Sequence, residues 1–70
     1  MIVNARTMRE LVWSVVRPQE VVVDRSPTGL VTARVVGSGV WFSAREGERI
    51  SLDDAVEWVV ERVKYWRPVQ

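Results

Sequence analysis

The sequence LVTARVVGSGVWFSAR, residues 30–45, decides the fold, because apolar side chains alternate with polar or small ones on both sides of a glycine-rich turn. Such alternation is typical of β-strands that bury one face. Gly37-Ser38-Gly39 supplies a short flexible connection between two strands, which we expect at 30–36 and 40–45. The stretch therefore predicts an antiparallel hairpin.

A further strand is expected immediately before this hairpin. Val21-Val22-Val23 is a β-branched run, and Ser26-Pro27-Thr28-Gly29 places turn-forming residues between that run and Leu30. Three adjacent strands joined by short turns form an antiparallel meander.

The segment before the strands carries the pattern of an amphipathic helix. Thr7 and Glu10 have the spacing of a capping box, in which each side chain satisfies a backbone N–H at the helix entrance. Pro18 ends the pattern, so the helix is expected at about 8–17, with a short strand at 2–3 before it. Its apolar stripe consists of Met8, Leu11, Val12 and Val15.

A second amphipathic helix is expected at about 52–66. Ser51 and Asp54 form a second candidate capping box, and Arg67-Pro68 ends the pattern. Acidic residues occupy the early turns and basic residues the late ones, as the helix dipole favours. The predicted core side consists of Leu52, Val56, Val59, Val63 and Trp66.

Two helices with one apolar stripe each most economically cover a single face of the sheet. The expected fold is one α+β domain over residues 1–70, a helix, a three-stranded antiparallel meander and a helix (αβββα), with both helices on one sheet face. A chain of 70 residues buries a modest core, and the absence of cysteine and histidine excludes disulfides and the usual zinc sites. An unusually apolar core or oligomerisation then has to stabilise it.

The uncovered sheet face is the first candidate binding site. Strand alternation assigns it an aromatic ring between hydroxyls and guanidinium groups, namely Thr32, Arg34, Trp41, Ser43 and Arg45. The ring could stack on a base of single-stranded DNA or RNA while the arginines meet phosphates. The alternatives are that the same surface contacts a second copy or another protein, or that Trp41 pairs only with arginines of its own chain.

Two helical stripes also combine tryptophan with arginine. Arg9, Trp13 and Arg17 are four residues apart and form a possible second interaction stripe. On the second helix, Trp58 and Tyr65 are expected to be partly buried, and the spacing of Trp58 and Arg62 suggests a contact within the helix.

No catalytic constellation is visible. Without histidine or cysteine, the commonest general bases, nucleophile pairs and metal ligands are absent, and the adjacent Asp53 and Asp54 point about 100 degrees apart on a helix. We therefore expect a binding module rather than an enzyme, with no cofactor and no metal. No apolar run is long enough for a membrane span or a signal peptide, which favours a cytoplasmic location.

Charge composition gives a weaker indication of the partner. The net charge is +1, but nine of the ten basic residues are arginine. Arginine is favoured at interfaces and on nucleic acid, and this composition is also typical of thermostable proteins.

The order of helix, three strands and helix resembles that of the double-stranded RNA-binding domain. In that family the entrance to the last helix is rich in lysine and docks on phosphates. The corresponding residues here, Ser51-Leu52-Asp53-Asp54, are acidic. The resemblance therefore extends to element order and not to that docking surface.

Overall fold

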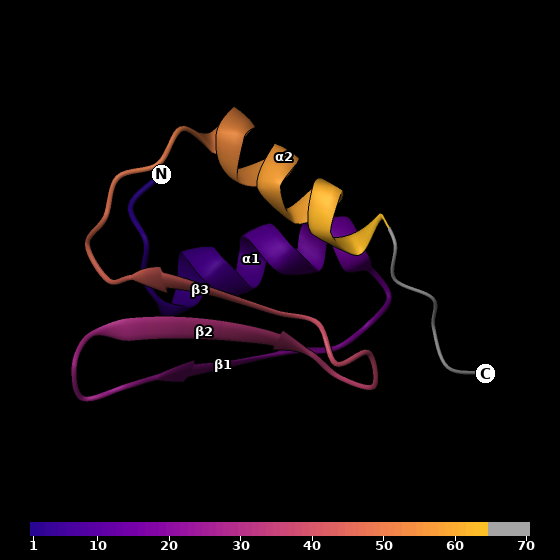
Figure 1. Ribbon diagram of the computed structural model, residues 1–70, viewed down its shortest axis with the longest axis horizontal. Coiled ribbons are helices and arrows are strands. Elements are labelled where there is room, and N and C mark those ends of the chain that lie inside the picture. The colour runs from indigo at the N-terminus through magenta and orange to yellow at the C-terminus, as the bar shows by residue number, and fades with distance from the viewer. Residues whose placement is uncertain (65–70) are drawn as a thin grey trace.

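The computed structural model describes residues 1–64 and contains two helices and a three-stranded sheet. The elements follow the predicted order: α1 (Ala5–Val16), β1 (Val21–Arg25), β2 (Leu30–Val35), β3 (Trp41–Arg45) and α2 (Leu52–Val63) (Figure 1). Within the described residues, neither helix has the length and apolar character needed to cross a bilayer.

The strands form the expected meander, with order β1-β2-β3 and antiparallel pairing throughout. Ala33 on the central strand lies opposite Val23 on one side and Phe42 on the other. The turn between β1 and β2 closes through a bond from the Gly29 N–H to the Ser26 carbonyl, at 3.0 Å. Gly29 has a φ of 84°, a conformation that favours glycine at this position.

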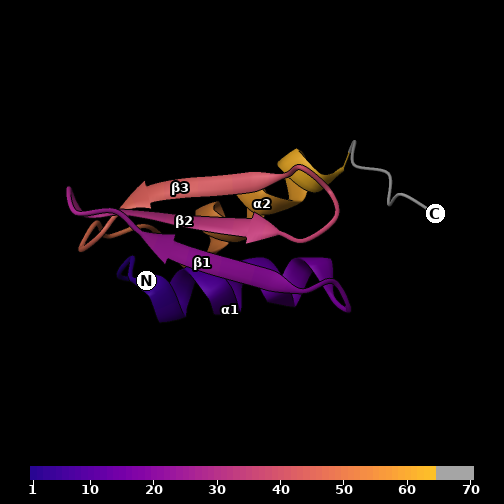
Figure 2. The ribbon, with the colours of Figure 1, turned by 90° about the horizontal axis from the view of Figure 1, so that it is seen from below.

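Both helices lie behind the sheet in Figure 2, α1 along β1 and α2 behind β2 and β3. The fold is therefore the predicted αβββα arrangement, in which the two helices cover one sheet face and residues 1–64 leave the other face uncovered. Among residues 1–64, the core between the layers consists of apolar side chains, and the largest that is fully buried is Phe42. Trp58 of α2 meets the Phe42 ring edge to face, with centroids 5.2 Å apart.

The start of α1 differs from the prediction. Asn4, rather than Thr7, is the N-cap: its side chain accepts from the Thr7 N–H, and the Thr7 hydroxyl accepts from the Asn4 N–H, both at 2.9 Å. Thr7 thus occupies the third helical position, and Glu10 pairs with Arg6 at 3.1 Å instead of capping. The helix begins at Ala5 because this capping box satisfies the donors one turn earlier.

The start of α2 also differs from the prediction. Ser51 precedes the helix but makes no side-chain capping bond, so the predicted second capping box is absent. Leu52 was expected in the core and is instead 58% exposed, because Ala55 and Val59 provide the buried contacts of this helix. Trp66 and the predicted helical residues beyond 64 lie outside the described residues.

The strand expected at residues 2–3 is reduced to an isolated bridge between Ile2 and Arg49. Next to it, the Val3 N–H donates to the Glu48 carbonyl at 2.8 Å, and Val3 itself is fully buried. The bridge ties the start of the chain to the segment that leads into α2.

Candidate functional site

The uncovered face of the sheet carries three cross-strand rows of side chains, fixed by the strand register. One row is Val22, Arg34 and Trp41, the next is Asp24, Thr32 and Ser43, and the last contains Leu30 and Arg45. All five residues predicted for this site therefore share one face.

Arg34 and Trp41 are direct neighbours across β2 and β3. The Val35 N–H donates to the Val40 carbonyl, so the adjacent pair Arg34–Trp41 occupies a non-hydrogen-bonded position, where side chains approach most closely. Trp41 is 51% exposed and Arg34 is exposed as well. The Trp41 ring is thus half exposed on this face, next to the exposed Arg34.

Arg62 of α2 also belongs to this site. Its guanidinium carbon lies 5.4 Å from the centroid of the Trp41 ring and 5.6 Å from that of Phe42. Within residues 1–64, Arg34 and Arg62 have no carboxylate within ion-pair distance. Two guanidinium groups without partner carboxylates therefore lie beside the exposed ring.

A hydroxyl pair occupies the middle of the face. The Thr32 and Ser43 side-chain oxygens are hydrogen-bonded at 2.9 Å. Each hydroxyl keeps an acceptor lone pair, and both side chains are half-buried. Asp24 lies opposite Thr32 on β1, so the β1 side of this row is acidic.

Arg45 and Leu30 form the far end of the face. Arg45 is exposed, has no ion pair within the described part of the chain, and stands four residues, or about 13 Å, along β3 from Trp41. Leu30 is 41% exposed beside it, and Val36, which follows β2 at the Arg34 end, is 42% exposed. Cationic groups therefore stand at both ends of a partly apolar surface.

Arg62 contacts a different aromatic ring from the one that its helical spacing suggested. Trp58, four residues earlier, is turned toward Phe42 and is half-buried, which confirms its predicted partial burial. Tyr65 lies outside the described residues. Helical spacing relates residues of one helix and gives no information on which strand a side chain reaches.

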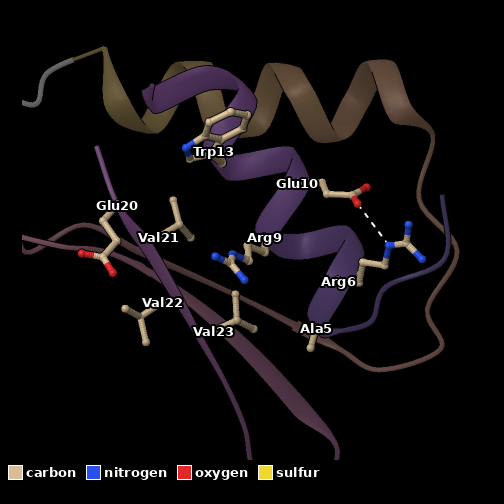
Figure 3. Close-up of a pocket in the computed structure, with 9 residues that line it drawn as sticks. All are labelled: Ala5, Arg6, Arg9, Glu10, Trp13, Glu20, Val21, Val22 and Val23. Atoms are coloured by element: carbon tan, nitrogen blue, oxygen red, sulfur yellow. Dashed lines mark hydrogen bonds and ion pairs between the residues drawn. The ribbon is translucent and has the colours of Figure 1, made fainter. Parts of the chain in front are cut away.

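The second predicted stripe, Arg9, Trp13 and Arg17, lies elsewhere. The Arg17 guanidinium carbon is 4.9 Å from the Trp13 ring centroid, and Trp13 is 46% exposed. Arg9 and Trp13 line a groove of about 760 Å³ between α1 and β1, at the sheet edge farthest from β3 (Figure 3). The stripe and the uncovered sheet face are therefore separate surfaces.

Among residues 1–64, no group of three or more histidine, cysteine, aspartate or glutamate side chains could hold a metal ion. No known protein family, characterised protein or solved structure matches the chain. The chemistry of the uncovered face is accordingly the basis for assigning a function.

Proposed function

We propose that this protein is a non-enzymatic binding module that holds single-stranded DNA or RNA on the uncovered face of its sheet. The observation that carries the proposal is the exposed Trp41 ring with Arg34 beside it and the Arg62 guanidinium 5.4 Å away. A base in a duplex is already stacked on its neighbours, whereas an unpaired base can stack on Trp41.

The remaining residues of the face have complementary roles in this proposal. Arg34, Arg45 and Arg62 are free of ion pairs within the described residues and would contact phosphates. The hydroxyls of Thr32 and Ser43 offer hydrogen bonds to sugars or base edges midway between the cationic ends.

Titration of a fluorescently labelled oligonucleotide, followed by anisotropy, tests the proposal. Because stacking on an aromatic side chain contributes about 1–3 kcal/mol per base, Trp41→Ala should weaken binding about 5- to 150-fold. If the wild type makes two or three phosphate contacts, its binding should weaken about 7- to 18-fold when the salt concentration rises from 50 to 200 mM. Trp13→Ala is the matched control, since Trp13 is similarly exposed on α1. No binding at 50 mM salt, or equal loss in both variants, would reject the proposal.

A second function, self-association through the same face, is supported by its apolar residues and its division of charge. Leu30, Val36 and Trp41 are all exposed, with Asp24 on the β1 side and Arg45 on the β3 side. Two copies packed face to face would bury these apolar groups and could bring the acid of one near the arginines of the other.

Sedimentation analysis distinguishes this second function. If it holds, the wild type should sediment as a dimer at tens of micromolar and Leu30→Glu as a monomer, because an apolar contact of the interface would be replaced by a charge that has to lose its hydration. Leu52→Glu is the control, since Leu52 is exposed on α2, away from the sheet face. A wild-type monomer throughout this range would exclude the sheet-face dimer.

A further inference from the structure

Within the part of the chain that the structure describes, the outer edge of β1 presents backbone groups without a partner strand. In an antiparallel ladder, successive residues direct their N–H and C=O groups alternately to one side of the strand and the other. The Ser26 N–H, just after β1, donates to the Leu30 carbonyl at 2.8 Å. The even-numbered residues of β1, Val22 and Asp24, therefore direct their backbone groups toward β2. Val21, Val23 and Arg25 therefore direct their N–H and C=O groups away from the sheet.

The edge lies alongside the groove between α1 and β1. Ala5, Arg9 and Trp13 line its helix side, and the groove measures about 760 Å³. Arg9 extends from α1 toward the strand, and Trp13 lies at one end (Figure 3). A strand placed along this edge would thus form backbone hydrogen bonds with β1 and contact the side chains of α1.

The edge lacks the usual protection against pairing. Natural edge strands are commonly blocked by proline, lysine or a bulge, and the run Val21-Val22-Val23 contains none of these. Its charged residues, Asp24 and Arg25, are confined to the end of the strand. A β-branched, regularly paired edge of this kind favours the addition of another strand.

The charged side chains that line the groove indicate which charge the added strand should carry. Arg6 is paired with Glu10 at 3.1 Å, and Glu20 lies beside Val21 toward the Trp13 end of the groove (Figure 3). Arg9, which extends toward the middle of the strand, has no carboxylate within ion-pair distance in residues 1–64. A two-fold antiparallel pairing of two β1 edges about Val23 would place both α1 helices on one side of the joined sheet and bring the two Arg9 side chains toward each other. The positive charge at the middle of the groove therefore opposes this pairing with a second copy and favours a segment with a central carboxylate.

We propose that an extended, acidic peptide segment of another protein adds to the outer edge of β1 as a fourth strand. Its backbone pairs with Val21, Val23 and Arg25, and a carboxylate on its helix-facing side meets Arg9. The proposal is independent of the uncovered sheet face, because the two surfaces share neither the backbone edge nor the arginines.

The test is an amide NMR titration of the full chain with two synthetic peptides that alternate valine and threonine around a central glutamate or a central lysine. The glutamate peptide should shift the amides of Val21, Val23 and Arg25 and the indole of Trp13, and bind about three- to tenfold more tightly than the lysine peptide. Arg9→Glu should reverse this preference. The substitution is at an exposed helical site without an ion pair in the described residues, so folding is expected to persist.

Backbone methylation of the peptide provides a control that leaves the protein unchanged. Methyl groups on the alternate amides that face β1 should abolish binding, whereas methylation of the other amides should preserve it. Equal effects of the two methylation patterns, shifts centred on Thr32 and Trp41, or a preference unchanged by Arg9→Glu would overturn the proposal. Concentration-dependent shifts at β1 without peptide would overturn it in favour of a second copy.

Discussion

Phe42→Ala is expected to remove a large part of the stability of the domain. Phe42 is fully buried, lies opposite Ala33 on the central strand, and has the Trp58 ring edge-on at 5.2 Å. Truncating a buried phenylalanine costs about 3–5 kcal/mol, because the apolar transfer energy is lost and a cavity remains. A domain of 70 residues is expected to have a free energy of unfolding of only about 3.5–10 kcal/mol.

Urea unfolding followed by circular dichroism measures this effect. Trp41→Ala is the matched control, because Trp41 is the preceding residue of β3 but half of its surface is exposed. We expect the control to lose no more than about 1 kcal/mol, within the range for exposed strand positions. Similar losses of stability in the two variants would mean that β3 does not bury its Phe42 face against the helices.

The pairing and facing of the strands could be predicted from sequence because both follow from local patterns. Alternation over 30–45 sets Ala33 and Phe42 on the covered side and Arg34 and Trp41 on the other, as the register confirms. A shift of one residue would move every side chain to the opposite face, so a strand with one apolar face has a strongly specified register.

Helix starts were harder to predict because two capping patterns overlap in the sequence. Asn4 and Thr7 can form one capping box, and Thr7 and Glu10 another. A further contact favours the first: the Thr7 hydroxyl also donates to the Ile2 carbonyl at 2.7 Å, next to the bridge between Ile2 and Arg49. That bridge joins residues far apart in the chain and has no local signature.

Contacts between different elements also limited the prediction of the candidate site. Strand alternation identified Arg34, Trp41 and Arg45, because these residues share one face by local geometry. It missed Arg62, whose contact with Trp41 depends on how α2 lies against the edge of the sheet. Sequence patterns thus predict which face a residue occupies more readily than which residue of another element it meets.

The largest difference between neighbouring substitutions is expected for Ala33→Asp and Arg34→Asp. Ala33 is fully buried between Val23 and Phe42, so a carboxylate there would lose its hydration without gaining a partner. The cost is several kcal/mol, comparable with the whole stability of a domain of this size. We expect Ala33→Asp to show no cooperative unfolding transition by circular dichroism at neutral pH.

Arg34→Asp introduces the same side chain one residue later and should leave the domain folded. Arg34 is exposed and has no ion pair in the described residues, so the loss should stay within about 1 kcal/mol, the scale of strand propensity. Because the new carboxylate would also repel phosphate beside Trp41, this folded variant should lose oligonucleotide binding. If Ala33→Asp folded or Arg34→Asp did not, the helices would have to cover the sheet face that carries Arg34. That face could not then be the binding site.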